Sequence, residues 1–365
     1  MIPQSLIGFD PNPERLKRAL PAVAFFAGFL WDALTLGRSV APLDLWILSA
    51  YLAGAGALLW WLGRRQQALA ALPSEPEPAV AALPWWRESG PYFLLQFLFG
   101  GLFSALFIFY FKSSGYLLAT LWALALGGLL VANEFLEDRY RRFTLAWALF
   151  GLCAMLLLNF VVPHVVGSIS VFWFILSTLA GAGLAHGLYL RTPGRPGRIR
   201  PVWAVAAGLL LAYFVNLIPP VPLVNKDIAV GHALAKTAGT FLLRQEKTPW
   251  WVFWRRVSGE VHVRPGEPIY CVSAVFAPRG LQTRLYHRWS HHDAERGWVT
   301  ASHIGFGLAG GREGGYRGYT WKRNLAPGEW KVTVETENGR TVAVHRFEVA
   351  TEPLADDAAL LEKTF

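Results

Sequence analysis

The sequence predicts an α-helical membrane domain followed by an all-β domain, and three observations support this prediction. The chain has 365 residues, of which 53% are hydrophobic and only 16% are charged, whereas soluble domains carry about 25% charged residues. Long apolar segments fill the first part of the chain and end at Pro219-Pro220. Beyond Lys247 apolar and polar residues alternate instead, as they do in half-buried strands.

Seven segments are long and apolar enough to form membrane helices, because about 20 residues span a hydrocarbon core of about 30 Å. They are 20–36, 43–62, 91–111, 116–136, 143–162, 169–190 and 202–218. Lipid offers the backbone no hydrogen-bond partner, so each segment must be helical. Charged residues precede the first segment and no small-residue cleavage site follows it, so we expect an uncleaved signal anchor.

The positive charges of the short loops predict the orientation of these helices. One side holds Arg15, Lys17, Arg18, Arg64, Arg65, Arg87, Arg139, Arg141, Arg142, Arg191, Arg195, Arg198 and Arg200, and the other holds Arg38 and Lys112. Because cytoplasmic loops are enriched in Lys and Arg, we expect a cytoplasmic N-terminus and an external C-terminal domain. The net charge of +9 comes mainly from this pattern, so no nucleic-acid partner is expected.

We divide the chain into a membrane domain (1–224), a connector and interface segment (225–256), an external β domain (257–350) and a tail (351–365). The connector has a weak helical pattern over 225–247. The run Pro249-Trp-Trp-Val-Phe-Trp-Arg-Arg256 places three tryptophans beside two arginines, and tryptophan favours the lipid headgroup zone. We expect this run to rest the β domain on the outer leaflet; alternatively, its rings fill the domain's own core.

Seven strands are predicted in the β domain, at 259–264, 268–277, 281–292, 297–306, 316–323, 329–336 and 340–349. Turns are marked by Pro327-Gly328 and by Asn338-Gly339, the second of which is typical of a tight two-residue hairpin. Seven short strands in one small domain predict an immunoglobulin-like sandwich. A small barrel is the alternative.

The densest functional signal is the run Gly310-Gly-Arg-Glu-Gly-Gly-Tyr-Arg-Gly-Tyr-Thr-Trp321. Its glycines indicate a backbone that side chains would forbid. Its candidate binding residues are Arg312, Glu313, Arg317, Tyr319 and Trp321. Since guanidinium groups bind carboxylate or phosphate and aromatic faces stack on flat groups, we predict a surface for an anionic or saccharide group. The alternative is an internal Arg–Glu pair that braces a loop with core aromatics.

A second cluster, His287-Arg-Trp-Ser-His-His-Asp293, contains three histidines. Zinc needs three or four convergent ligands, whereas same-face neighbours on a strand lie about 7 Å apart. We therefore expect no metal and no cofactor here, and instead a solvated or partner-facing strand. His287 and Trp289 are added to the candidate binding surface.

Polar residues near the predicted outer helix ends suggest a different site. Asp32, His164 and Asn216 could line an outward-facing pocket, with Asp32 and His164 as an acid/base pair. A charge at the bilayer centre costs about 2.5–3.5 kcal/mol, but near a helix end the cost is smaller. Interfacial solvation with interhelical hydrogen bonds is therefore the alternative.

The β segment resembles a known family. The motifs His287-x-Trp289, Gly310 to Tyr319, Pro327-Gly-Glu-Trp-Lys-Val332 and Phe347-x-Val349 are similar to the bacterial "domain of unknown function 2914" module, over roughly 281–349. Lys331 stands where arginine is expected. The resemblance implies a bacterial membrane protein and no established activity.

These observations predict an inner-membrane protein and favour a binding protein over an enzyme, since no Ser/Cys–His–Asp arrangement stands out. Its partners would be the lipid bilayer and an envelope protein or glycan bound by the external β domain. The alternative is a transporter or membrane-embedded transferase of a lipid-linked substrate, acting through Asp32, His164 and Asn216. A sensor that needs a separate cytoplasmic partner is a third option.

Overall fold

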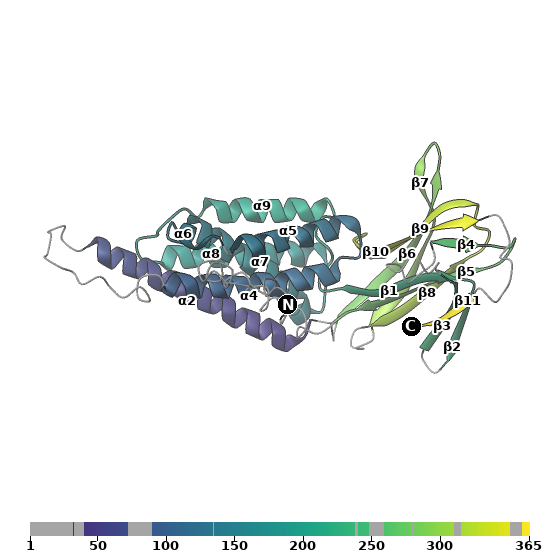
Figure 1. The fold of residues 1–365 in the computed structure, drawn as a ribbon, viewed down its shortest axis with the longest axis horizontal. Coiled ribbons are helices and arrows are strands. Elements are labelled where there is room, and N and C mark those ends of the chain that lie inside the picture. Colours follow the sequence, from purple (N-terminus) through teal and green to yellow (C-terminus); the bar gives the residue numbers. More distant parts are fainter. Residues whose placement is uncertain are drawn as a thin grey trace, which may run out of the picture.

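The computed structural model describes residues 32, 40–71, 90–133, 135–237, 240–247, 259–278, 281–309, 315–350 and 360–365. Helices occupy one end of the elongated molecule and strands the other (Figure 1). The predicted change of character at Pro219-Pro220 is confirmed, since the last helix ends at Phe214 and the first strand begins at Val224.

The helical region contains six helices longer than one turn among the described residues. They are α2 (Pro42–Ala70), α4 (Gly90–Ser113), α5 (Leu117–Asn133), α7 (Thr144–Val166), α8 (Val171–Arg191) and α9 (Arg200–Phe214), and α6 is a single turn (Glu137–Tyr140). Each long helix overlaps one predicted segment. In the described part of the chain, α2, α4, α7 and α8 are long and apolar enough to cross a membrane, while α5 and α9 are shorter.

The prediction of seven membrane helices is not supported, because the described residues hold six. The first predicted helix, 20–36, lies outside these residues except for Asp32. The last predicted helix, 202–218, ends early at Phe214. Asn216 has a φ of 58°, in the left-handed region that a right-handed helix cannot include. The helix therefore ends before it reaches Pro219.

The helices pack around α7, whose most apolar stretch is 67% buried, against 33–50% for α2, α4 and α8. Helix α8 approaches it closely at Gly181, where an added Cβ would lie 2.6 Å from the backbone nitrogen of Met155. The outward faces remain apolar, with Trp46 76% and Leu211 67% exposed. Helices that are apolar all round are typical of a membrane span, and Figure 1 shows them grouped apart from the strands.

Positive charge collects at the bundle end that lies away from the strands. Successive helices alternate in direction, so this end holds Arg64, Arg65, Arg139, Arg141, Arg142, Arg191, Arg195, Arg198 and Arg200. The loop between α8 and α9 is fixed there, because the Trp147 indole donates to the Pro196 carbonyl at 3.0 Å. At the opposite end of the bundle, next to the strands, Lys112 is the only lysine or arginine in the described loops and helix ends.

Eleven strands form three sheets in the described part of the chain. They are β1 (Val224–Gly231), β2 (Ala233–Thr237), β3 (Thr240–Glu246), β4 (Glu260–His262), β5 (Ile269–Phe276), β6 (Gln282–Asp293), β7 (Gly297–Ala309), β8 (Tyr316–Lys322), β9 (Gly328–Thr336), β10 (Thr341–Ala350) and β11 (Leu360–Thr364). The strand orders are β1-β5-β8, β4-β10-β9-β6-β7 and β11-β3-β2. All seven predicted strands are present, as β4 to β10.

The connector and the tail differ from their predictions. Segment 225–247, expected to be weakly helical, forms β1, β2 and β3, and part of the 351–365 tail forms β11. Strands β1, β3 and β11 have distant partners, as in Val230 with Cys271 and Leu361 with Gln245, whereas β2 pairs with its neighbour β3. Local periodicity carries no information about such pairing. The tryptophan run 249–256 lies outside the described residues.

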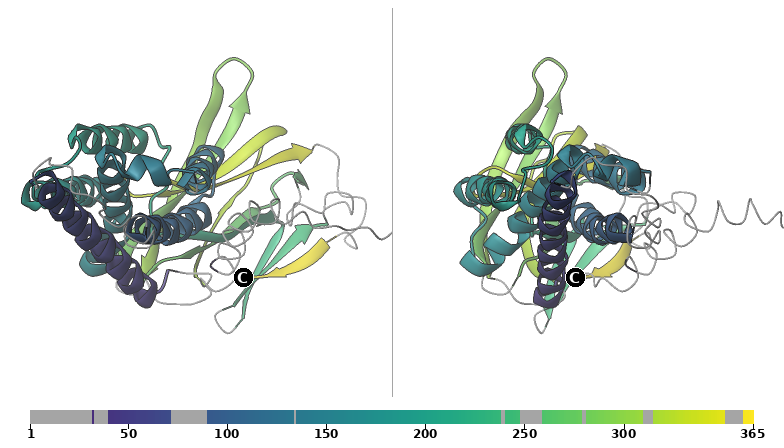
Figure 2. Two further views of the ribbon diagram at one scale, coloured as in Figure 1. Left: turned by 60° about the vertical axis from the view of Figure 1, so that its left-hand side comes forward. Right: turned by 90° about the vertical axis from the view of Figure 1, so that its left-hand side faces the viewer.

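The β1-β5-β8 sheet and the five-stranded sheet share one apolar core, which includes Cys271, Trp289, Trp330, Val332 and Phe347. The small β11-β3-β2 sheet covers the opposite side of β5, where Phe241, Leu243, Val272 and Phe365 cluster. The β region is therefore two facing sheets with a third, smaller sheet laid against one of them. A long β6–β7 hairpin projects from it (Figures 1 and 2).

The hairpin between β9 and β10 turns through three residues rather than the two expected at Asn338-Gly339. The Thr336 N–H donates to the Arg340 carbonyl at 2.9 Å, and the Gly339 N–H donates to the Thr336 carbonyl at 2.9 Å. Gly339 has a φ of 70°. This is a type I turn followed by a left-handed glycine, the usual form of a three-residue hairpin loop.

This hairpin tip joins the two regions of the molecule. The Arg340 guanidinium, 6% exposed as a residue, donates from Nη1 to the Tyr213 carbonyl and from Nη2 to the Ile218 carbonyl, the latter at 2.8 Å. Its carbon lies 3.7 Å from the centroid of the Tyr213 ring. Carbonyls at a helix C-terminus lack intrahelical partners and attract cations, so the end of α9 is a suitable seat for this arginine.

Candidate functional site

Strand β8 presents two exposed aromatic side chains on one face. Tyr319 is 43% exposed and Trp321 is 50% exposed. They share this face with Arg317, since alternate residues of a strand point the same way. Gly318 and Thr320, between them, are buried. We call Arg317, Tyr319 and Trp321 the β8 face; it brings together three of the residues predicted from the sequence.

Neighbouring side chains hold the rings of the β8 face. The Tyr319 ring lies 5.5 Å from that of Phe241 on β3, and Trp321 lies opposite Tyr270 on β5. The Arg323 guanidinium carbon lies 5.3 Å from the Trp321 ring centroid. Close packing lowers the rotamer freedom that a ligand would otherwise have to restrict. The face is thus an aromatic platform with cationic groups at its edge.

His287 and Trp289 lie elsewhere, in the core between the two facing sheets, and both are 0% exposed. The His287 Nε2 is 2.8 Å from the Ser273 hydroxyl and its Nδ1 is 3.0 Å from the Thr320 hydroxyl. The Trp289 indole also donates to Thr320, at 2.9 Å. Burial lowers the pKa of His287 to about 3, so it is neutral. These two residues offer no surface to a ligand and are left out of the β8 face.

The glycine-rich run before β8 is described only at its end. Arg312 and Glu313 lie outside the described residues, so their predicted binding role stays a prediction. Gly315 has a φ of 83°, and an added Cβ would lie 3.2 Å from the Val275 backbone. The expectation that this run needs a backbone forbidden to side chains holds at this glycine.

The three residues of the predicted membrane pocket have separate partners. Asp32 accepts a hydrogen bond from the Ser104 hydroxyl at 2.7 Å. His164 has its Nδ1 3.3 Å from the Phe160 carbonyl of its own helix, and the Asn216 carbonyl accepts from the Tyr116 hydroxyl at 2.9 Å. Among the described contacts none joins two of the three, and their acid/base role stays a prediction.

A hollow lies at the bundle end nearest the strands, bounded by α7, α8 and Pro219–Val221. Its polar wall is formed by Asn159 and Ser177, which hydrogen-bond to each other. Its volume is about 20 Å³, which is room for about one water molecule and far below the roughly 300–1,000 Å³ usual for ligand pockets. None of the three predicted pocket residues lines it, so it gives the transporter alternative no specific support.

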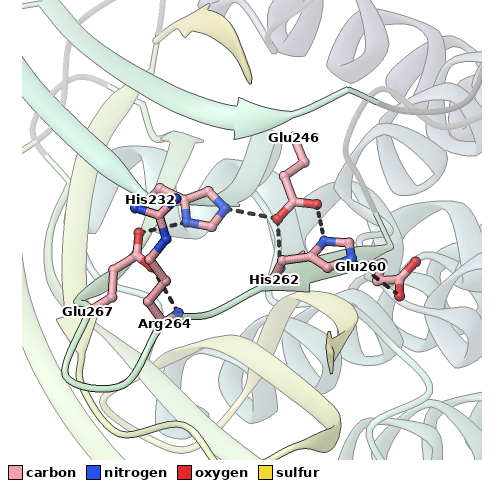
Figure 3. Close-up of polar contacts among 6 residues, drawn as sticks. All are labelled: His232, Glu246, Glu260, His262, Arg264 and Glu267. Carbon is pink, nitrogen blue, oxygen red and sulfur yellow. Dashed lines mark hydrogen bonds and ion pairs between the residues drawn. The ribbon is translucent and has the colours of Figure 1, made fainter. Parts of the chain in front are cut away.

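A chain of alternating acids and histidines, which the sequence did not reveal, crosses the place where strands of all three sheets meet (Figure 3). It runs Glu267, His232, Glu246, His262, Glu260. The His232 Nδ1 is 2.9 Å from Glu267, and its Nε2 is 2.8 Å from Glu246. The other Glu246 oxygen is 2.9 Å from the His262 Nδ1, and His262 approaches Glu260 at 3.9 Å.

Only a protonated imidazole can donate to two carboxylates at once, so this geometry requires His232 to carry a positive charge. Burial would lower the pKa of His232, but its hydrogen bonds to Glu246 and Glu267 outweigh burial and raise it. Burial would likewise raise the pKa of Glu246, yet its bonds from His232 and from the His262 side chain and backbone lower it. For both His232 and Glu246, the charged partners outweigh burial in setting the direction of the pKa shift.

The burial and mutual pairing of the acid–histidine chain favour a structural role over a catalytic one. Its two central side chains, His232 and Glu246, are 8% and 7% exposed, and its members already satisfy one another. No group of three or more His, Cys, Asp and Glu residues in the described part of the chain is arranged to hold a metal ion. Sequence analysis missed it because its members come from β3, β4 and two loops, and share no short-range motif.

Comparison with known proteins finds one family match, and this match lies in the β region. Residues 282–349 match the family model described as "Protein of unknown function (DUF2914)". The C-terminal part of the chain is therefore similar to this family. It includes the β8 face and the Arg340 hairpin, but none of the helices. No curated protein matches the chain.

Solved structures resemble the chain only weakly. A β-glucosidase from Listeria innocua is 13% identical over 27% of this chain, which spans just 15% of that protein, with a TM-score of 0.20. An immunoglobulin-like protein from Pseudomonas aeruginosa is 12% identical over 33% of this chain and 96% of its own, also at 0.20. At such scores neither likeness carries an argument about fold or function.

Proposed function

We propose that the protein is a membrane-anchored binding protein whose β domain recognises an envelope glycan through the β8 face. The supporting observation is the pair Tyr319 and Trp321, 43% and 50% exposed on one face of one strand. Tyr and Trp supply large, rigid contact areas at low conformational cost. These two rings offer stacking faces, and Arg317 and Arg323 beside them offer cationic hydrogen-bond donors, a combination that suits a sugar chain with anionic groups.

The proposed location is the bacterial inner membrane, with the β domain on the external side. The nine arginines at the bundle end away from the strands support this orientation, because positive loops face the cytoplasm. The β domain adjoins the opposite end. Its two facing sheets and the parallel pairing of β4 with β10 also favour an immunoglobulin-like arrangement, which we propose on topology alone.

Loss of the two exposed rings tests the glycan proposal. The full-length protein in nanodiscs would be mixed with cell-envelope polysaccharide and with envelope proteins, for wild type and for a Tyr319→Ala/Trp321→Ala variant. We expect polysaccharide binding to weaken by about 10- to 100-fold, since stacking contacts contribute roughly 1–3 kcal/mol each in comparable aromatic platforms.

Val299→Ala is the matched control, since Val299 is 41% exposed but lies on the β6–β7 arm rather than on β8. It should bind polysaccharide as wild type does. If the double variant keeps full polysaccharide binding with an intact fold, the proposal fails. Binding confined to an envelope protein and lost in the double variant would replace the glycan with that protein.

A further inference from the structure

The outer face of the five-stranded sheet gathers positive charge around one tryptophan. Lys331 on β9 lies directly opposite Arg346 on β10, and Ser290 on β6 lies opposite Lys331 on its other side. Ser290 is small and 2% exposed, and Trp298 lies on the neighbouring strand β7. The Lys331 Nζ is 4.2 Å from the Trp298 ring centroid, and the Arg346 guanidinium carbon is 5.7 Å from it.

A third cation, Arg288, shares this face, but it is already paired. Its Nη2 lies 3.0 Å from Glu335, and the same carboxylate is 2.8 Å from the His303 Nε2. His303 in turn stacks on Tyr286 with ring centroids 4.6 Å apart. Glu335 is therefore committed to Arg288 and His303, and cannot also neutralise Lys331 and Arg346.

Lys331 and Arg346 have no ion-pair partner among the described residues. The next pair along the same strands and face, Glu329 and Glu348, is itself a directly opposed pair of like charges. Each acid lies about 7 Å along its strand from the neighbouring cation, and no ion pair joins the two pairs in the described structure. Like charges directly opposite each other destabilise a sheet, so the two cations lower stability as they stand.

From this arrangement we infer that Lys331 and Arg346, held by Trp298, form a binding site for an oxyanion, a carboxylate or phosphate group of the ligand. Arginine offers a planar fork to such a group and lysine a point charge. Trp298 holds both cations in place through its ring face, so less order is lost on binding. Burial and the two nearby arginines, Arg346 and Arg288, lower the pKa of Lys331. A bound anion would offset the repulsion between these positive charges.

This site is separate from the β8 face, because it lies on the outer side of a different sheet. It does not depend on the glycan proposal, and either can fail alone. If both hold, the β domain contacts its ligand or ligands on two faces, one aromatic and one charged.

The test compares thermal unfolding and hydrogen exchange of the full-length protein in phosphatidylcholine nanodiscs at low ionic strength. Inorganic phosphate and glucuronate are the probes, and chloride at equal ionic strength corrects for screening. We expect one or both probes to raise the midpoint and to slow exchange in β9 and β10, since ligands that bind the folded state stabilise it. The relative response to the two probes identifies the oxyanion class.

In Lys331→Gln/Arg346→Gln we expect binding at least ~10-fold weaker, because two charge-assisted contacts are lost. The same variant should unfold at a higher temperature than wild type without any anion, since the like-charge repulsion is removed. A merely structural role for the two cations would lower that temperature instead.

Two further variants complete the test. Trp298→Ala should weaken binding while both charges remain. Arg244→Gln, which removes a cation 59% exposed and paired with Glu362 on the small sheet, should bind as wild type does. Equal anion responses in the double variant and wild type, or no response beyond chloride, would overturn the inference.

Discussion

Two buried histidines of the β region are held in opposite charge states. His287 lies between the two facing sheets with hydroxyl partners, Ser273 and Thr320, and is neutral. His232 lies where the sheets meet, between Glu246 and Glu267, and is positively charged. Their side chains are comparably hidden, so the difference teaches that the partners, and not the depth, decide whether a buried imidazole carries a proton.

The contrast also separates two ways of holding sheets together. Around His287 the sheets are held by an apolar core, in which the polar network is fully neutral. Around His232 charge pairs connect β3, β4 and the loops beside them. A neutral network costs little to keep buried, whereas a charged one is costly as soon as one partner is lost.

Removal of Glu246 should produce the largest effect on stability. Glu246→Gln leaves the buried His232 cation with one carboxylate in place of two and weakens the bond to His262. We expect a loss of about 3–5 kcal/mol in the free energy of unfolding of the β region, measured by denaturant titration of the protein in detergent micelles.

Glu362→Gln is the control for that prediction, since its ion pair with Arg244 is 59% exposed at both ends. It should cost no more than about 1 kcal/mol. Equal losses for the two variants would show that the acid–histidine chain braces nothing.

Arg340 extends the comparison to a buried cation whose hydrogen bonds in the described structure go to carbonyls rather than to carboxylates. Arg340→Met removes two charged hydrogen bonds and the contact with the Tyr213 ring. We expect a loss of about 1.5–3 kcal/mol per charged bond, localised at the junction. Hydrogen exchange should quicken in 336–344 and around 213–218, and stay unchanged in β2, β3 and β11. Exchange that quickens throughout the β region would assign Arg340 to general stability instead.

The two histidines should give opposite pH signatures. The pKa of His287 is lowered in the folded state, so the unfolded chain binds more protons below pH 6.5, and stability should fall by about 1.4 kcal/mol per pH unit on acidification towards pH 3. The pKa of His232 is raised, so its contribution is complete below pH 6.5 and is lost as pH rises through the folded value. Glu246, with a lowered pKa, contributes above about pH 4.5 and loses this as pH falls through its folded value.

Single variants should therefore flatten different limbs of a plot of unfolding midpoint against pH. His287→Gln should flatten the acid limb, and His232→Gln the alkaline limb. If His232→Gln flattened the acid limb instead, the two charge assignments would have to be exchanged.

The smallest stability effect is expected on the β8 face. Trp321→Ala changes an exposed side chain, so the unfolding free energy should move by no more than about 0.5 kcal/mol. Denaturant titration checks this directly. A loss above about 2 kcal/mol would assign Trp321 to the fold, and would remove it from the proposed binding surface.

Periodicity was informative wherever an element's own residues decide its structure. Apolar runs located the six described helices, and alternation located β4 to β10. It failed for β1, β3 and β11, which pair with strands far along the chain, and for β2, whose partner is the neighbouring β3. It also overestimated the last helix, since Asn216 takes the left-handed conformation of a helix C-cap, in which the Leu217 N–H donates to the Ala212 carbonyl at 2.9 Å.

The candidate site was predicted in part for the same reason. The alternation of Arg317, Tyr319 and Trp321 places them together on any strand, and the structure keeps them together. His287 and Trp289 share a face too, but only packing shows that this face is the inner one. The opposition of Lys331 and Arg346 depends on the register of β9 with β10, and the ring above them comes from β7. Neither the register nor the position of the Trp298 ring can be inferred from a linear sequence motif.

The joint at Arg340 limits how the parts of this protein can be exchanged. Its donors match the positions of two carbonyls, one in the last turn of α9 and one just beyond it, on a segment outside the matched residues 282–349. Transplanted onto an unrelated bundle, the same hairpin would bury a guanidinium without acceptors. The β region therefore cannot be joined to any helical bundle without loss of these hydrogen bonds. The β9–β10 turn and the end of α9 have to change together, and we expect them to be inherited as one unit.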